Sequence, residues 1–417
     1  MIGQRIKELR KQSKLTQQEL AKDIITRSYL SQIEKGMVQP SYEVLEKLSK
    51  RLNCSVEDLY KTVENKDMLL SQMKREIKSA ENYIITNSFD KIEQMIQKED
   101  YFKKEGLNHY DKGILNWVHG KYYEKKRDFN HAITYYNESI TELELGNHTN
   151  EMLRSLDSIG YVYSQSNQNE KALLVLTKAH RIMIYDQIHG VLRVSLLSNL
   201  GVVHGKLKEY YSAINFLEEA RELNEKIESY YKAGDIYMAL GVCYMELNRH
   251  EEAKKSYEKA LKYFKLNENK FQEAGTYTNL GILSIYQDNY NQAKLYLNTA
   301  INTYNKIKAE GSLVMNAQVE LGRVYYLQKE YDQGISLCKD IIAMDAVNKP
   351  KAQAYELLGD IYNRLLNSEL SLEYYKKAKE IINFNHPEYK RVCKKIGDVY
   401  YLLNEYQKAS DVYKECL

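Results

Sequence analysis

Apolar residues in the first sixty positions recur at the spacing of short amphipathic helices. The spacing predicts five helices, at about 6–13, 16–24, 27–35, 41–48 and 56–60. Thr16 and Glu19 make a capping box at the start of the second, and Gly36 stops the third. The segment is therefore expected to fold as a small all-helical domain of its own.

Beyond residue 61 the pattern becomes a repeat. A glycine recurs every 37 to 41 residues, a small residue follows it after twelve positions, and a large residue usually comes four later. The pairs are Gly120/Ala132, Gly160/Ala172, Gly201/Ala213, Gly241/Ala253, Gly281/Ala293, Gly322/Gly334, Gly359/Ser371 and Gly397/Ala409. Glycine is unfavourable inside a helix, so its recurrence indicates close packing of antiparallel helices that must stack on their neighbours.

Both patterns resemble known families. The strings IGQRIKELRKQSKLTQQELA, RSYLSQIEKG and PSYEVLEKLSKRLNCSVEDLY resemble the phage-repressor type of helix-turn-helix, although the turn before the third helix is one residue short and lacks the usual glycine. The glycine frame resembles the tetratricopeptide repeat (TPR). The expected fold is all-α: a five-helix DNA-binding head at 1–60, a linker at 61–67, and a right-handed superhelix of about nine TPR-like helix pairs at 68–417. The first repeat, 68–108, is degenerate, and clear repeats run from about 113.

Composition narrows the classes of function. Residues 1–60 hold 11 Lys and Arg against 8 Asp and Glu, so this segment carries the whole formal charge of +3. The positive head suits a polyanion. No apolar stretch is long enough to cross a membrane, and no signal peptide is evident, so a cytoplasmic location is expected. The five cysteines are scattered, and no catalytic, nucleotide-binding or metal-binding motif occurs. We expect neither an enzyme nor a cofactor, and Trp117 should be a core residue.

The third helix of the head is the expected reader of DNA. Its exposed face carries Arg27, Ser28, Ser31 and Gln32, and guanidinium and amide groups pair with guanine and adenine in the major groove. Gln17 and Lys35 are placed to contact the sugar-phosphate backbone. The alternative is that these are solvated polar residues that do not contact DNA. For Tyr29, local packing of the ring is an equally good interpretation. One head makes few contacts, so binding as a dimer to paired half-sites is expected.

The first helix of each repeat should line the concave face of the superhelix. Counting from the glycines, the inward polar positions are Arg154, Asp157, Tyr161, Ser195, Asn199, Asp235, Asn279, Asn316, Glu320 and Arg323. Asn199 and Asn279 stand two before the glycine in SNLG and TNLG, and an amide both donates to and accepts from a peptide backbone. We hypothesise that these two clamp an extended peptide. The alternative is that they are polar residues of a wet groove.

The combination resembles the Rap/NprR/PlcR/PrgX group of quorum-sensing regulators of low-GC Gram-positive bacteria, and the repeat number is more similar to NprR than to the shorter PlcR. The resemblance implies a transcription regulator whose TPR groove binds a short intracellular signalling peptide that changes conformation or oligomeric state. The last repeats, 355–417, keep Tyr and Leu on their surface and are expected to dimerise. The alternative function is a Rap-like protein that binds a response regulator and inhibits a phosphorelay.

Overall fold

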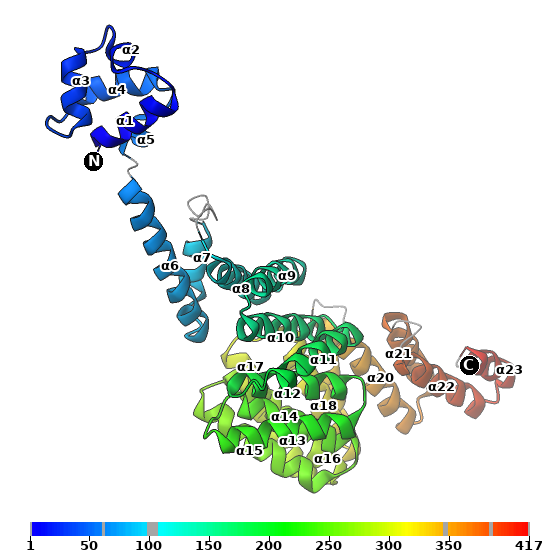
Figure 1. The fold of residues 1–417 in the computed structure, drawn as a ribbon. Coiled ribbons are helices and arrows are strands. Elements are labelled where there is room, and N and C mark those ends of the chain that lie inside the picture. The colour runs from blue at the N-terminus through cyan, green and yellow to red at the C-terminus, as the bar shows by residue number, and fades with distance from the viewer. Residues whose placement is uncertain (1, 61–62, 98–106, 345–348, 383–386, 416–417) are drawn as a thin grey trace. The chain divides into compact units, whose positions relative to one another are not determined.

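A computed structural model describes residues 2–60, 63–97, 107–344, 349–382 and 387–415. All regular elements of these residues are helices, as the sequence predicts (Figure 1). The chain forms two compact units, Met1–Gln168 and Asn169–Leu417, which are taken separately below.

The head of the first unit consists of five helices: α1 (Ile2–Gln12), α2 (Gln17–Ala21), α3 (Arg27–Glu34), α4 (Tyr42–Arg51) and α5 (Val56–Tyr60) (Figure 1). The predicted capping box at Thr16 and Glu19 is present, and Thr26 and Ser41 cap α3 and α4. The core is a cluster of apolar residues from all five helices: Ile6, Leu20, Leu30, Ile33, Leu45, Leu48 and Leu59. The five predicted helices are thus confirmed.

The turn between α2 and α3 differs from the expectation. The spacing predicted a second helix reaching Ile24, but α2 ends at Ala21. Asp23 adopts a left-handed conformation with φ 59°, which ends the helix without the glycine usual in this fold. Aspartate visits this region more readily than most residues.

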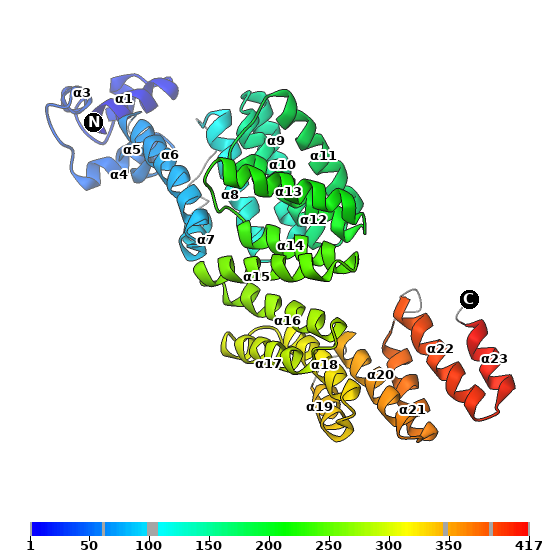
Figure 2. The same ribbon diagram turned by 90° about the horizontal axis from the view of Figure 1, so that it is seen from below.

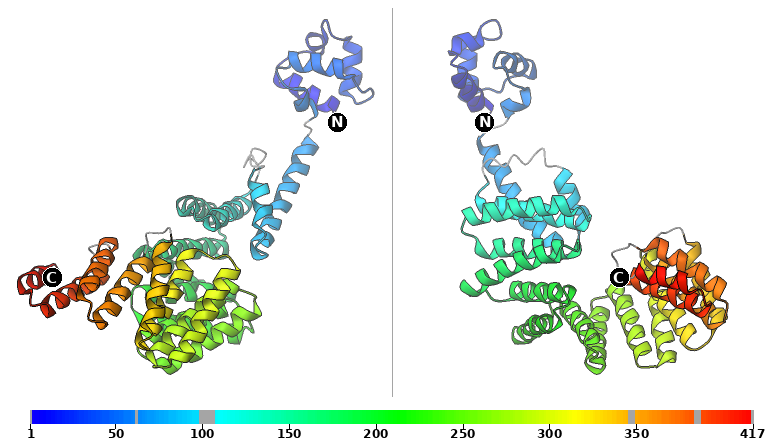
Figure 3. Two further views of the ribbon diagram at one scale, coloured as in Figure 1. Left: turned by 180° about the vertical axis from the view of Figure 1, so that it is seen from behind. Right: turned by 90° about the vertical axis from the view of Figure 1, so that its right-hand side faces the viewer.

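The remainder of the first unit contains α6 (Val63–Ile85), α7 (Phe89–Gln97), α8 (His109–Lys125), α9 (Phe129–Leu145) and α10 (Thr149–Gln165). In the part of the predicted degenerate repeat that is described, Ile92 and Met95 of α7 are buried, and α6 and α7 pack on α8. Helices α8, α9 and α10 lie side by side (Figure 3). Trp117 on α8 is buried, as expected.

The second unit continues the helices in sequence, and Figure 2 shows their antiparallel pairing. Their bounds are α11 (Asn169–Tyr185), α12 (Val191–Lys206), α13 (Tyr210–Lys226), α14 (Ala233–Glu246), α15 (His250–Leu266), α16 (Lys270–Tyr286), α17 (Tyr290–Lys306), α18 (Gly311–Leu327), α19 (Tyr331–Ala343), α20 (Lys349–Arg364), α21 (Ser368–Ile381), α22 (Pro387–Leu402) and α23 (Tyr406–Lys414). We call α12, α14, α16, α18, α20 and α22 the first helices, and the side on which their polar residues meet the first-helix face.

The glycine frame explains how the paired helices approach. A Cβ atom added at Gly241 would lie 2.5 Å from the Tyr257 ring, and one at Gly281 would lie 2.6 Å from Leu297 Cγ. The same contact joins a frame glycine to the large residue sixteen positions later in four further pairs: Gly120 and Tyr136, Gly201 and Leu217, Gly359 and Tyr375, and Gly397 and Tyr413. The predicted packing role of the frame is confirmed.

Candidate functional site

Helix α3 presents most of the predicted DNA-reading residues to solvent. Arg27, Ser28 and Gln32 are exposed, and Ser31 is half-buried. Tyr29 packs against the apolar core of the head, so its ring serves the fold locally. Lys35 is exposed at the C-cap of α3. The structure therefore brings four of the predicted polar residues onto one short helix.

A buried ion pair fixes α3 against α1. Arg10 of α1 donates to both carboxylate oxygens of Glu34, with Nε and Nη2 at 2.6 and 2.9 Å. Gln17 Nε2 of α2 donates to Glu34 Oε2 at 2.8 Å. The Glu34 side chain is only 2% exposed, so its charge is held almost wholly by these two partners. Gln17, predicted as a DNA contact, is in this structure also a member of the network that positions α3.

The pKa of Glu34 records this environment. Burial raises it, but the hydrogen bonds from Arg10 and Gln17 and the charges of Arg10 and Lys7 outweigh burial, so the pKa lies below its ordinary value. Glu34 therefore stays ionised and remains paired with Arg10.

Helix α1 also approaches the backbone of α3. A Cβ atom on Gly3 would lie 1.8 Å from the Ile33 carbonyl oxygen, so only glycine fits there. Sequence reasoning missed Gly3, Glu34 and the role of Arg10, because their partners lie 17 or more residues away along the chain.

In the first unit, the predicted binding residues of α10 are engaged within the unit. Arg154 Nη2 pairs with Glu81 of α6 at 2.9 Å, and its guanidinium lies 3.9 Å from the centroid of the Trp117 ring. Asp157 is buried, whereas Tyr161 is exposed. Arg154 thus joins α6 to α10, and a ligand that bound it would have to compete with Glu81.

In the second unit, the two predicted amides stand in unlike surroundings. Asn199 is buried, and its Oδ1 accepts a hydrogen bond from Lys232 Nζ at 3.1 Å. The same ammonium donates to Ser195 Oγ at 3.0 Å. Asn279 is half-buried, and its Nδ2 faces Met238 Sδ at 3.2 Å. Lys232, which the sequence reading did not single out, precedes α14 with a left-handed φ of 53° and ties it to α12.

The two acidic positions of the first-helix face differ in exposure, because Asp235 is exposed whereas the Glu320 side chain is mostly covered. Surrounding protein raises the pKa of Asp235, and Lys232 offsets this only in part. Desolvation likewise raises the pKa of Glu320, although Arg323 lies 3.5 Å away. Asn316 is exposed on the same helix, α18. A ligand that brought a positive or N–H donor group to Glu320 would offset the desolvation of this carboxylate.

Further along the face, polar residues pair with one another. Arg391 of α22 binds Glu356 of α20 at 2.7 Å, and Lys395 binds both Glu356 and Asp360, at 2.8 and 2.7 Å. These charges are already matched. The polar groups open to a ligand therefore concentrate on α12 to α18.

Comparisons with known proteins identify the same two parts, a helix-turn-helix head and tetratricopeptide repeats. Residues 6–59 match the helix-turn-helix family, and residues 192–266, 233–306 and 350–417 match the tetratricopeptide repeat. The immunity repressor of Bacillus phage phi105 is 34% identical over 100 residues, which are 24% of this chain and 67% of the repressor. The chain belongs to the helix-turn-helix proteins and carries tetratricopeptide repeats.

Solved structures share the fold of this helix-turn-helix and TPR protein. The apo quorum sensor NprR of B. thuringiensis is 18% identical, with a TM-score of 0.62 over 83% of this chain and 98% of NprR. NprR in complex with its cognate peptide NprX is 17% identical, with a TM-score of 0.55 over 82% of this chain and 96% of NprR. A Rap protein complexed with competence and sporulation factor is 15% identical, with a TM-score of 0.56 over 83% of this chain and 96% of the Rap protein.

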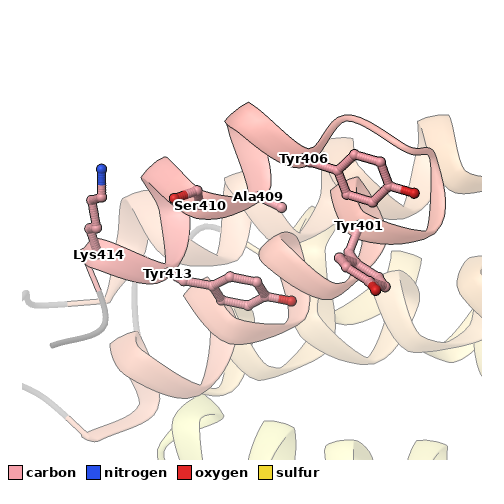
Figure 4. Close-up of a pocket in the computed structure, with 6 residues that line it drawn as sticks. All are labelled: Tyr401, Tyr406, Ala409, Ser410, Tyr413 and Lys414. Atoms are coloured by element: carbon pink, nitrogen blue, oxygen red, sulfur yellow. The ribbon is translucent and has the colours of Figure 1, made fainter.

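A surface pocket of about 420 Å³ lies on the α22–α23 pair of this TPR region. Tyr401, Tyr406 and Tyr413 line it, with Lys414 pointing away (Figure 4). Tyr401 and Tyr406 are more than half exposed, which agrees with the apolar surface expected on 355–417.

Within the described residues no group of His, Cys, Asp or Glu could hold a metal ion, and no helix has the length and apolar character to cross a membrane. Cys54, Cys243, Cys338 and Cys393 are free thiols, while Cys416 lies outside the described residues.

Proposed function

We propose that this protein is a sequence-specific transcription regulator whose repeat region binds a short signalling peptide. The observation that carries the proposal is the joining of two parts in one chain. The head presents the polar face of α3 to solvent, and a TPR region of NprR-like fold carries amides and the poorly hydrated Glu320 carboxylate on its first helices.

The DNA half of the proposal rests on α3. Its exposed Arg27 and Gln32 match the side chains that read guanine and adenine, and the buried Arg10–Glu34 pair holds the helix rigidly. A dimer with two such heads would read paired half-sites.

Selection from random DNA tests this half directly. We expect the full chain to enrich a paired motif, and Arg27→Ala and Gln32→Ala each to weaken binding to it about 10- to 100-fold, since a bidentate base contact is worth about 1–3 kcal/mol. Lys11→Ala, which removes an exposed cation of the head outside α3, should lower affinity for all sequences alike and only slightly. Equal losses in all three variants would contradict base reading by α3.

The peptide half rests on α12 to α18. Asn279 uses its Nδ2 in the contact with Met238, so a peptide N–H group can donate to its carbonyl oxygen. Asn199 stands at the equivalent position of α12, where a peptide would have to exchange with Lys232. Neighbouring packed helices stand about 8–10 Å apart, so α12 to α18 spans roughly 25–30 Å, and an extended chain covers this with about seven to nine residues. NprR, which shares the fold, has been crystallised with its cognate peptide NprX.

Calorimetry on the full chain tests this half, with synthetic peptides of five to ten residues encoded next to the gene. We expect one of them to bind, and Asn199→Ala and Asn279→Ala each to weaken it about tenfold through the loss of backbone hydrogen bonds. Asn302→Ala on the exposed side of α17 is the matched control and should bind as the wild type does. If no peptide binds, or if Asn302→Ala weakens peptide binding as much as the other two substitutions, the peptide proposal fails.

A Rap-like role is the second candidate, because the Rap structure shares the TPR fold. Here the first-helix face would hold a response regulator and inhibit a phosphorelay. Pull-down of purified response regulators by the full chain, with and without peptide, distinguishes the two functions. If the response regulator is captured only when the TPR region is present, and Arg27→Ala does not change the capture, the Rap-like role is favoured.

A further inference from the structure

A pocket of about 390 Å³ opens in the second unit where α13 ends, α14 begins and α15 passes. The polar and aromatic residues that matter in its lining are Asn224, Glu225, Glu228, Tyr230, Tyr237 and Tyr263. None of them belongs to the DNA-reading or peptide-binding positions discussed above. The pocket is therefore a separate feature with its own chemistry.

Three tyrosine rings form one wall of the pocket. The Tyr237 and Tyr263 rings stack with centroids 5.8 Å apart and planes within 6°, and Tyr230 lies 5.8 Å from Tyr263. This cluster already attracts a cation, since Lys259 Nζ stands 4.9 Å from the Tyr237 centroid. Aromatic faces bind ammonium and guanidinium groups through the ring quadrupole.

A buried acceptor lies among these rings. Asn224 is 5% exposed, and its Nδ2 donates to the Tyr231 carbonyl oxygen at 2.7 Å, which fixes the direction of the amide. Its Oδ1 is buried and accepts no hydrogen bond from any described residue. A buried acceptor left without a donor is costly, so a ligand here gains by supplying an N–H group.

The charge of the pocket is negative. Arg221 contributes a cation, but Glu218 and Glu225 bind it, the latter at 2.7 Å. Glu228 is exposed on the turn after α13 and pairs with no cation of the described chain. Its carboxylate is available to an incoming positive group.

We propose that this pocket binds an arginine side chain displayed by a partner protein. A guanidinium is planar, so it can stack on the tyrosine rings, and it has five N–H donors to offer to the Asn224 oxygen and the Glu228 carboxylate, which line the same pocket. A lysine offers no plane to stack, a neutral aromatic group leaves the carboxylate unmatched, and an anion is repelled. The pocket thus adds a contact for a protein partner to the DNA and peptide functions proposed above, and does not depend on them.

Saturation-transfer NMR on the full chain tests the proposal with two tripeptides, Ac-Gly-Arg-Gly-NH2 and its citrulline analogue. Citrulline has the shape of arginine without its charge. We expect the arginine peptide to bind and the citrulline peptide to bind at least about fivefold more weakly. Tyr263→Leu and Glu228→Gln should each weaken the arginine peptide about 3- to 10-fold.

Matched controls separate this site from others. Tyr211→Leu removes an exposed ring of α13, and Glu258→Gln an exposed carboxylate of α15, and both should bind as the wild type does. Asn199→Ala should also leave the arginine peptide unaffected, so failure here is distinct from failure of the peptide-sensing proposal. Equal affinity for the two tripeptides, or no loss in Glu228→Gln, overturns the inference. If Tyr263→Leu proves unfolded by circular dichroism, Glu228→Gln, which lies on an exposed turn, decides.

Discussion

At the residue scale, the head depends on one carboxylate in an unusual place. Glu34 is the last residue of α3, where the helix dipole disfavours a negative charge, and it is almost fully buried. Arg10 and Gln17 make this tolerable by supplying three hydrogen bonds. Removing one partner of a buried ion pair leaves an unmatched charge and costs about 3–5 kcal/mol.

The lowered pKa of Glu34 predicts a loss of stability in acid. A carboxyl group whose pKa is lower in the folded state stabilises the fold fully above its unfolded pKa, near 4.3, and this contribution disappears as the pH falls through the lower folded value. We expect hydrogen-exchange protection of residues 27–34, corrected for intrinsic rates, to hold from pH 8 to about 5 and to fall below about pH 4.

Substitution isolates the effect of Glu34. Because glutamine keeps one acceptor oxygen for Arg10, Glu34→Gln should cost less than a truncation: about 2 kcal/mol of head stability at pH 7 and clearly less at pH 3.5. Glu43→Gln, which removes an exposed carboxylate paired with Lys47, should leave protection unchanged. A Glu34→Gln penalty that is the same at both pH values would contradict the role of its charge.

The sequence predicted the residues of the head that follow a local pattern and missed those that do not. The exposed face of α3 follows from helical spacing, so Arg27 and Gln32 were placed correctly on the surface. The Arg10–Glu34 pair joins residues 24 positions apart, and Lys232 reaches Asn199 over 33 positions. No short-range rule contains such pairs.

At the element scale, the repeats depend on glycine contacts between paired helices. Gly281→Ala places a methyl group 2.6 Å from Leu297 Cγ, and we expect it to destabilise the protein by about 1–2 kcal/mol despite the better helix propensity of alanine. In a Leu297→Ala background the penalty should vanish, because the two residues share one contact. Thermal unfolding of the single and double variants measures the coupling.

Gly311 provides the control for this prediction. It begins α18, and a Cβ atom there would meet nothing within 4 Å. Gly311→Ala should therefore be neutral or stabilising by up to about 1 kcal/mol. A loss as large as that of Gly281→Ala would show that the penalty is not steric.

The turns between helices show a regularity that the sequence reading did not find. A residue with positive φ stands in turn after turn of the repeats at intervals of 20 or 21 residues, as at Asn248, Glu268 and Asp288. Asn, Lys, Glu and other polar residues all occupy these places, so no single amino acid marks them. The glycine frame was visible because its chemistry is the same in each repeat, whereas the turns repeat only in conformation.

At the scale of the whole molecule, charge and chemistry are divided between the two parts. The head carries the excess positive charge, and the other residues are balanced. Matched ion pairs occupy the first-helix face on α20 and α22, which leaves α12 to α18 for a ligand. The fold class followed from periodicity, but which polar positions were already engaged within the protein depended on tertiary contacts.

A regulator of this kind requires that the two parts communicate. A ligand that contacts several repeats shifts the molecule only if it binds one arrangement better than another. The effect must then be reciprocal, so that peptide alters DNA affinity by the factor by which DNA alters peptide affinity.

The decisive measurement is the affinity of the full chain for its selected DNA site, by fluorescence anisotropy, with and without a saturating peptide identified by calorimetry, while light scattering follows the mass of the complex. We expect the peptide to change the apparent Kd at least fivefold or to change the number of chains per site, and Asn199→Ala with Asn279→Ala to abolish the change. The same Kd and the same mass with and without bound peptide would contradict the account.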